Sequence, residues 1–172
     1  MHGRTTPLVF VTVGTDHHPF DRLIRWVDRW APRAPEVRFM VQYGTATPPT
    51  HAEGTPFVGP DEFASALDTA AAVVCSGGPG AIMETRAAGL RPIVVPRRAG
   101  LGEHVDDHQR RFADFMARRD LVTVADDESS LDNALDALAA DPDAYRIDRL
   151  AAAPPGVARI GALIDDLVLG GP

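Results

Sequence analysis

A glycine-rich turn is the segment of this 172-residue chain whose residue types most clearly suggest binding chemistry. It runs Cys75-Ser76-Gly77-Gly78-Pro79-Gly80-Ala81, after four apolar residues and before a stretch with helical spacing. Glycines allow close approach of the backbone to a ligand, and unpaired amides at a helix start attract an anion. Pro79 suits the first helical turn, where its missing N–H would have no partner. The spacing predicts either a diphosphate site or a tight turn that binds nothing.

An acidic residue follows this turn at a useful distance. Glu84 lies four residues after Gly80, about one helical turn, so we expect its carboxylate just beyond the anion site. A carboxylate accepts hydrogen bonds from both hydroxyls of a vicinal diol, which predicts a contact with a ribose. An acid in the first turns of a helix is also favoured by the helix dipole, and both roles are compatible.

The loop Thr15-Asp16-His17-His18 follows an apolar run at 8–13 that reads as a buried strand. In a parallel sheet this loop lies on the same rim as the glycine-rich turn. Either Asp16 or His17 is a candidate general base for deprotonating an acceptor hydroxyl. The alternatives are a capping aspartate beside solvated histidines, or a base supplied by a partner protein.

A second histidine pair lies four residues apart at His104 and His108, with Asp106 and Asp107 between them. That spacing suits metal ligands on a helix, but a zinc-protease pattern requires Glu where Val105 stands, and the sequence shows no third ligand. We therefore expect no metal and no cofactor. Arg97 and Arg98 can pair with a sugar carboxylate, bind phosphate or point to solvent.

Apolar runs and helical spacing alternate along the whole chain, which predicts an α/β fold: a Rossmann-like parallel sheet of about six strands with helices on both faces. Strands are expected at 8–13, 37–43, 57–58, 72–75, 93–95 and 121–124, with an exposed loop at 44–55. Helices are expected at 20–30, 61–68, 81–88, 104–118, 127–139 and 144–169, the last broken at Pro154 and Pro155. The amphipathic piece 157–169 either covers the sheet or docks on a partner.

Length, composition and charge exclude several classes of function. A chain of 172 residues predicts one domain over 1–172, and a net charge of -7 disfavours nucleic acid. All 17 basic residues are Arg, which excludes Walker-type phosphate loops and Schiff-base chemistry. The single cysteine, and the lack of a signal-like N-terminus or a long apolar run, predict a cytoplasmic protein.

Several ordered motifs together resemble the C-terminal domain of glycosyltransferase family 28, over about residues 9–124. They are Ser76-Gly77-Gly78-Pro79-Gly80-Ala81-Ile82-Met83-Glu84, then Ala87-Ala88-Gly89, Pro92-Ile93-Val94-Val95-Pro96 and His108-Gln109. The opening Val11-Thr12-Val13-Gly14-Thr15 resembles the short catalytic subunits of that family, which work with a separate membrane-associated subunit in N-glycan and bacterial exopolysaccharide assembly. The resemblance implies the C-terminal half of a GT-B fold.

The resemblance also implies roles for individual residues. Glu84 contacts the ribose, the backbone from Gly78 to Ile82 holds the diphosphate, and Val58 contacts uracil through its main chain. His108 and Gln109 face the sugar hydroxyls. The full set of expected nucleotide-sugar residues is Gly14, Thr15, Val58, Ser76, Gly77, Gly78, Gly80, Ala81, Ile82, Glu84, His108 and Gln109.

These implications combine into one expected function. The chain is expected to be the catalytic subunit of a UDP-sugar-dependent hexosyltransferase, inverting and metal-independent, that acts on a lipid-linked acceptor together with a membrane-associated acceptor-binding subunit. The alternative is a non-catalytic module that binds or senses a nucleotide sugar.

Overall fold

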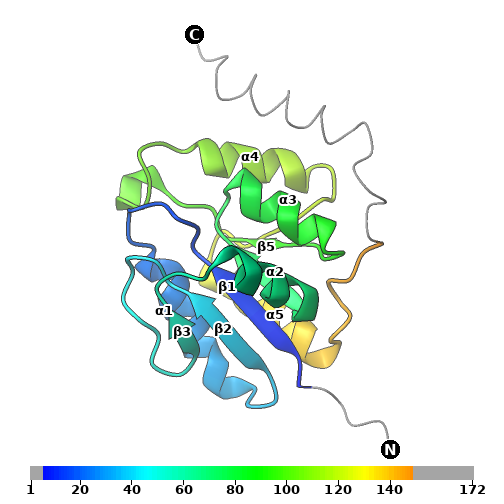
Figure 1. Ribbon diagram of the computed structural model, residues 1–172. Coiled ribbons are helices and arrows are strands. Elements are labelled where there is room, and N and C mark those ends of the chain that lie inside the picture. Colours follow the sequence, from blue (N-terminus) through cyan, green and yellow to red (C-terminus); the bar gives the residue numbers. More distant parts are fainter. Residues whose placement is uncertain (1–5, 149–172) are drawn as a thin grey trace, which may run out of the picture.

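The structure is a computed structural model that describes residues 6–148. Six parallel strands form one sheet in the order β3-β2-β1-β4-β5-β6 (Figure 1). This confirms the predicted Rossmann-like sheet. The strands are β1 Leu8–Thr12, β2 Arg38–Gln42, β3 Glu53–Thr55, β4 Ala72–Cys75, β5 Ile93–Val94 and β6 Thr123–Val124.

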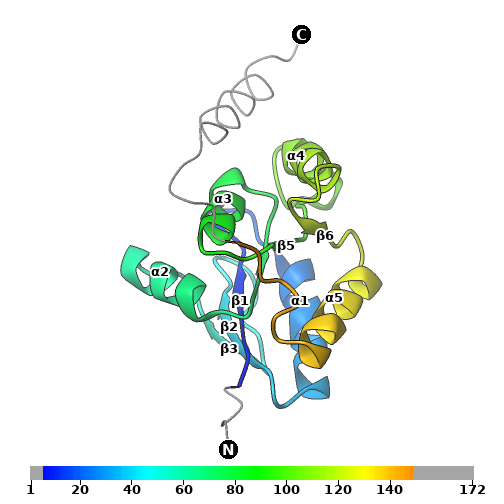
Figure 2. The ribbon, with the colours of Figure 1, turned by 90° about the vertical axis from the view of Figure 1, so that its right-hand side faces the viewer.

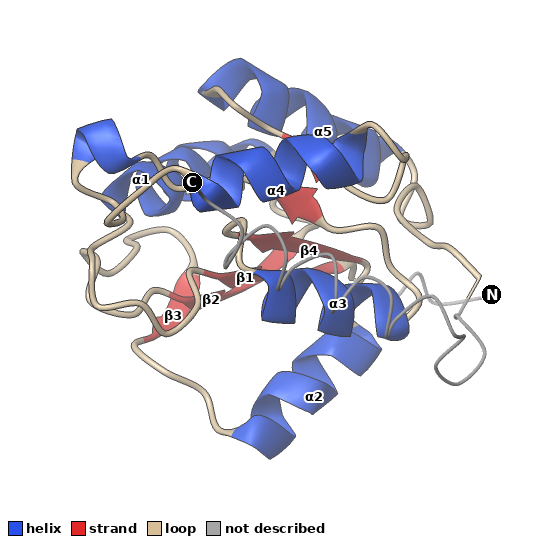
Figure 3. Ribbon diagram, turned by 90° about the horizontal axis from the view of Figure 1, so that it is seen from above, coloured by secondary structure: helices blue, strands red, loops and turns tan. Residues whose placement is uncertain are grey.

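Helices cover both faces of the sheet, as predicted. Helices α1 and α5 lie on one side, and α2 and α3 on the other (Figure 2); seen from above, the strands lie between these layers (Figure 3). The α-helices are α1 Asp21–Trp30, α2 Pro60–Thr69, α3 Pro79–Ala87, α4 His108–Ala117 and α5 Glu128–Ala140, with short 3-10 helices η1 Ala31–Arg33 and η2 Ala99–Leu101.

Two apolar cores, one on each face, hold these layers together. On one face Val9 and Val11 of β1 belong to a core with apolar residues of α1 and α5. On the other face Phe10 belongs to a core with residues of α2, α3 and α4. Because successive residues of a strand point to opposite faces, a strand buried on both is largely apolar, which explains the apolar run at residues 8–11 of β1.

The strand order places a crevice at the centre of the sheet. The chain builds outward from β1 through β2 to β3, and then returns to the other side of β1 with β4. The loops after β1 and β4 therefore both leave the sheet at the carboxyl ends of the strands, but they run toward opposite faces. Ligands of open parallel sheets bind at this switch point, beyond the carboxyl ends of the strands.

The third strand differs from the prediction. It lies at Glu53–Thr55, inside the segment expected to be a loop, whereas Phe57 and Val58 lie beyond its end. The pairing is set by backbone bonds: the Tyr43 amide donates to the Thr55 carbonyl at 3.0 Å. An edge strand that is largely exposed needs no apolar pattern, so its sequence gives no signal.

Helix α4 also begins later than predicted, at His108 instead of His104. The Asp106 carboxylate accepts the His108 amide at 2.9 Å, and Asp107 Oδ1 accepts the Ala99 amide at 3.0 Å. These side-chain bonds keep the segment before α4 in turns instead of a helix.

The predicted C-terminal helix is wrong at its start, because residues 144–145 form a turn and Arg146 bridges to Leu90. The rest of that helix, including the amphipathic piece 157–169, lies outside the described residues. No helix within residues 6–148 is long and apolar enough to span a bilayer.

Candidate functional site

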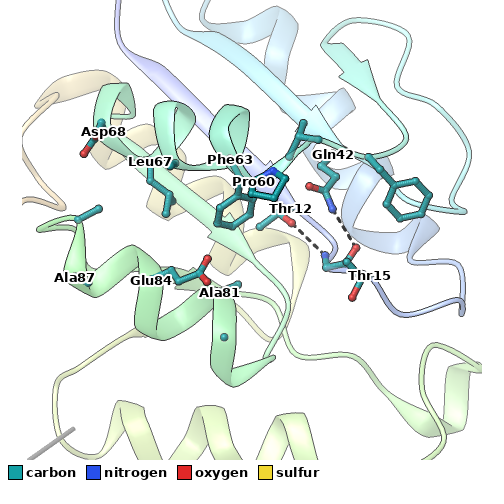
Figure 4. A pocket seen from close by; sticks show the side chains of 16 residues that line it. Thr12, Thr15, Gln42, Pro60, Phe63, Leu67, Asp68, Ala81, Glu84 and Ala87 are labelled. Atoms are coloured by element: carbon teal, nitrogen blue, oxygen red, sulfur yellow. Dashed lines mark hydrogen bonds between the residues drawn. The ribbon is translucent and has the colours of Figure 1, made fainter. Parts of the chain in front are cut away.

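A pocket of about 740 Å³ opens at the carboxyl ends of β1 and β2, between α2 and α3 (Figure 4). Its volume is in the range of small-molecule sites, and its position is the switch point of the sheet. Six of the residues expected to bind a nucleotide sugar line it: Gly14, Thr15, Val58, Gly80, Ala81 and Glu84.

The start of α3 presents unpaired amides to this pocket. Gly78 is the N-cap, has extended backbone angles and offers no side chain to cap the helix. The first helical bond shown at this end runs from the Ile82 amide to the Gly78 carbonyl at 3.3 Å. The amides of Gly80 and Ala81 therefore precede the helical ladder, and they are free for an anion.

Other members of the predicted loop serve packing. Ile82 is fully buried, and its amide is used inside the helix, so the structure assigns it to the core. Ser76 is buried, and its amide donates to the Thr12 carbonyl at 3.3 Å. None of Ser76, Gly77, Gly78 and Ile82 is among the residues that line the pocket.

Glu84 lies one turn into α3 and is exposed. Its carboxylate points from α3 toward Pro60 and Phe63 of α2, across the mouth of the pocket (Figure 4). Gly80, Ala81 and Glu84 thus line the same side of the pocket, as the helical spacing predicted. An anion at the helix start and a diol one turn away can both be reached from α3.

The opposite wall contains residues that the sequence did not point to. Gln42 donates from Nε2 to the Gly14 carbonyl at 3.2 Å, and Thr12 accepts the Gly14 amide at 3.1 Å; both bonds are dashed in Figure 4. Gly14 has a φ of 77°, which favours glycine. Phe57 is 52% exposed at the rim and was missed because it was assigned to a strand.

Gln109 packs against the glycine-rich loop from the first turn of α4. A methyl group at Gly77 would lie 2.8 Å from Gln109 Cβ, so the two segments are in close contact. Gln109 is buried, and its Oε1 has no hydrogen-bond partner among the described residues. A buried acceptor without a donor is rare in folded proteins and fits a residue that contacts a ligand hydroxyl.

The predicted base candidates lie on the rim beside the pocket, but they do not line it. Asp16 accepts the His18 amide at 2.7 Å and contacts His18 Nδ1 at 2.6 Å. Although partial burial acts to raise the pKa of Asp16, the hydrogen bonds from His18 and the Arg97 charge outweigh it, and the pKa is lowered. Asp16 therefore stays ionised, while His17 is exposed with its ring against His18.

The second histidine pair meets this loop. His104 Nε2 lies 3.3 Å from Asp16 Oδ2, and His104 Nδ1 lies 3.8 Å from Asp106 Oδ1. His108 Nδ1 contacts the same Asp106 oxygen. Burial lowers the pKa of His104, and the neighbouring His108 lowers it further, so His104 is neutral at pH 7. His108 is thus held by Asp106 and His104.

Arg97 holds the two loops together from inside. Its side chain is fully buried and donates to the carbonyls of Val13, His18 and Glu103 at 2.7–2.9 Å. Arg22 forms a two-bond ion pair with the Glu103 carboxylate, with both distances 2.8 Å. Of the three roles considered for Arg97, the structure shows none, because its donors are directed at the backbone. No sequence pattern indicated that Arg97 would link the two loops through their carbonyls.

Arg98 is likewise engaged with the backbone, since its guanidinium donates to the Asp126 carbonyl.

Fold and site together define a Rossmann-like α/β domain with a small-molecule pocket at its switch point. Residues 8–154 match the family described as the glycosyltransferase family 28 C-terminal domain. The chain therefore belongs to that family.

One curated relative is the UDP-N-acetylglucosamine--N-acetylmuramyl-(pentapeptide) pyrophosphoryl-undecaprenol N-acetylglucosamine transferase of Ralstonia nicotianae. It is 37% identical over 70 residues, which are 41% of this chain and 18% of the relative. The matched segment is thus a small part of that enzyme.

Solved structures show the same fold at low identity. Acinetobacter baumannii MurG aligns with a TM-score of 0.61 and 19% identity, over 96% of this chain and 51% of that one. The calicheamicin glycosyltransferase CalG4 gives 0.63 and 19%, over 96% and 43%. The solution structure of ALG13 gives 0.59 and 17%, over 90% and 94%. The chain therefore has the fold of one half of a GT-B glycosyltransferase.

Proposed function

We propose that this chain is the donor-binding catalytic subunit of a UDP-sugar-dependent hexosyltransferase. The observation that carries the proposal is the shared wall of the pocket, where the free amides at the start of α3 lie one turn from the Glu84 carboxylate. A diphosphate suits the amides, and the ribose diol next to it in a uridine diphosphate suits the acid. Family membership supports the same ligand.

The pocket accommodates the rest of the donor in a consistent order. The nucleobase lies against Val58 and Phe57 at the end of β3, where an exposed ring is available for stacking. The sugar extends beyond the pocket toward Gln109, which packs on Gly77 and, like His108, does not line the pocket; the buried Gln109 Oε1 has no partner among the described residues and would accept a hydroxyl hydrogen. His108, which was expected to share this role, is engaged with Asp106, so Gln109 is the stronger candidate.

The proposed reaction is a single displacement with inversion. The acceptor oxygen attacks the anomeric carbon as the bond from that carbon to the β-phosphate oxygen breaks, and UDP leaves with the electron pair. The acceptor proton passes to a base on the rim of β1, for which His17 is favoured because Asp16 is engaged by His18 and His104. The α3 amides stabilise the departing diphosphate by fixed dipoles, so Mg²⁺ is dispensable.

A separate subunit completes the proposed enzyme. The chain corresponds to about half of the MurG and CalG4 chains but to nearly all of ALG13. The name of the Ralstonia relative includes a pyrophosphoryl-undecaprenol acceptor. We further propose a lipid-linked acceptor and a membrane-associated partner that binds it, with this chain at the cytoplasmic face; the acceptor in the name of the Ralstonia relative supports the first part.

Glu84 provides the test. Titration calorimetry with UDP should show Glu84→Ala weakened by about 1–3 kcal/mol, roughly 5- to 150-fold in Kd, because a charged hydrogen bond is lost. Glu62→Ala is the matched control, since Glu62 is an exposed acid in the first turn of α2 that does not line the pocket. Equal UDP affinity of Glu84→Ala and the unaltered chain would refute the ribose contact.

Transfer assays separate catalysis from binding alone. The chain is co-expressed with its acceptor subunit and supplied with labelled UDP-sugars, including UDP-N-acetylglucosamine. Transfer that is lost in Glu84→Ala and Gln109→Ala supports the proposed enzyme. Tight UDP-sugar binding without turnover in the complete pair would instead indicate a binding or sensing module.

A further inference from the structure

Three side chains, two from the loop before α4 and one from the first residue of α4, converge on one small volume. His104, Asp106 and His108 each offer one ligand atom, and these atoms lie within 4.8 Å of one another. His104 Nδ1 is 3.8 Å from Asp106 Oδ1, and His108 Nδ1 is in contact with that same oxygen. Ligands about 2.0–2.2 Å from a tetrahedral ion are separated by roughly 3.3–3.6 Å, so His104 and Asp106 are already near this separation, whereas His108 would have to exchange its hydrogen bond with Asp106 for the ion.

A carboxylate from another loop orients the first of these imidazoles. Asp16, which follows β1, lies 3.3 Å from His104 Nε2 through its Oδ2, while its Oδ1 is held by His18. A proton on Nε2 directed at Asp16 leaves His104 Nδ1 as an acceptor; it now accepts the Asp106 amide at 3.4 Å, a long bond that the ion would replace. Histidine ligands of metals are oriented by a carboxylate on their second nitrogen in this same way.

We propose that His104, Asp106 and His108 bind a divalent transition metal ion of the zinc class, with Asp16 as the positioning residue for His104. Two imidazoles and one carboxylate suit Zn²⁺, Co²⁺ or Ni²⁺, whereas Mg²⁺ prefers an all-oxygen set. The histidine spacing did not favour a metal because it lacked the glutamate of a zinc-protease pattern, whereas Asp16, which orients His104, lies far away in the chain. The fold brings them together.

The position of the site suggests what the ion does. Its ligands belong to the loop before α4 and to the first residue of α4, and Asp16 belongs to the loop after β1. The buried Arg97 already joins these two loops through their carbonyls. An ion would join them a second time at the surface. The three ligands do not line the pocket, and Asp106 is half exposed, so water can complete the coordination. The ion would therefore fix the rim and leave donor binding to α3.

Metal binding can be measured without nucleotide, so its outcome is independent of the proposed function. The chain without a histidine tag is titrated with Co²⁺, followed by visible absorption, and with Zn²⁺ by calorimetry. One bound ion per chain is expected. His104→Ala and Asp106→Asn should each weaken Zn²⁺ at least tenfold, and Asp16→Asn by about 10- to 100-fold, the range seen for such outer carboxylates.

A second histidine–aspartate pair supplies the matched control. His51 Nδ1 lies 3.3 Å from Asp28 Oδ2 on a different part of the surface, so His51→Ala should leave Zn²⁺ affinity unchanged. Circular dichroism checks that each variant is folded; Asp106→Asn is isosteric, and its side chain is exposed. The proposal is overturned if the folded chain binds no Zn²⁺, or if His104→Ala and Asp106→Asn bind it as tightly as the unaltered chain.

Discussion

The contact between Gly77 and Gln109 allows a sharp test of how the glycine-rich loop is built. In Gly77→Ala the new Cβ would lie 2.8 Å from Gln109 Cβ, 2.8 Å from its carbonyl oxygen and 3.1 Å from its carbonyl carbon. Two of these three atoms are backbone atoms of α4, so a change of side-chain rotamer cannot relieve the clash. The loop and α4 must move apart.

The size of the effect follows from that geometry. Ordinary contacts of a Cβ begin near 3.4 Å, so the separation must grow by 3.4 − 2.8, about 0.6 Å. Both segments are constrained: Ser76 is bonded to Thr12 of β1, and Phe112 of α4 is buried in the core. Overpacking of a well-packed site costs about 1–3 kcal/mol, and we expect Gly77→Ala to fall in this range.

The neighbouring glycine gives the control. In Gly78→Ala the nearest atom to the new Cβ is Ser76 Oγ at 3.8 Å, and the backbone angles of -70° and 131° are accessible to alanine. Urea denaturation without nucleotide should therefore show a lower free energy of unfolding for Gly77→Ala and a change within about 0.5 kcal/mol for Gly78→Ala. Equal stability of the two variants would refute the close contact between the loop and α4.

Two further predictions concern buried polar groups. Arg97→Met should lower the free energy of unfolding by about 3 kcal/mol or more, because three carbonyls lose a charged donor. If urea denaturation shows a loss below about 1 kcal/mol, Arg97 does not stabilise the two loops as described. Burial raises the pKa of the Cys75 thiol to about 12, so a thiol reagent at pH 8 should label this cysteine only after unfolding. Above pH ~8.5 the unfolded thiol ionises but the folded one does not, so stability should fall with rising pH, and Cys75→Ala should reduce that slope.

The sequence predicted those parts of the fold that depend on local pattern. The apolar runs of β1 and β4 reveal strands buried on both faces, and the turn at Pro79 reveals the start of α3 within two residues. The wall formed by Gly80, Ala81 and Glu84 followed from helical spacing alone. These features are visible because each is encoded by residues adjacent in the chain.

The remaining parts depend on contacts between distant residues. Strand β3 exists because its backbone pairs with β2, although Glu53-Gly54-Thr55 has no strand pattern. The His104 loop is shaped by Asp16, 88 positions earlier (104 − 16) and therefore beyond the reach of any local motif. Phe57 was misplaced because an aromatic residue followed by valine favours a strand, whereas here it lies at the rim of a pocket.

The charges around the pocket bear on how the proposed diphosphate would be held. Among the described residues that line the pocket none is a cation, and two, Asp68 and Glu84, are acids. The chain has no lysine, and the first two arginines after β5, Arg97 and Arg98, direct their guanidinium groups at backbone carbonyls. A diphosphate in this pocket would therefore be held by the amides of α3, whose dipoles are fixed before the ligand arrives and need no counterion to be displaced.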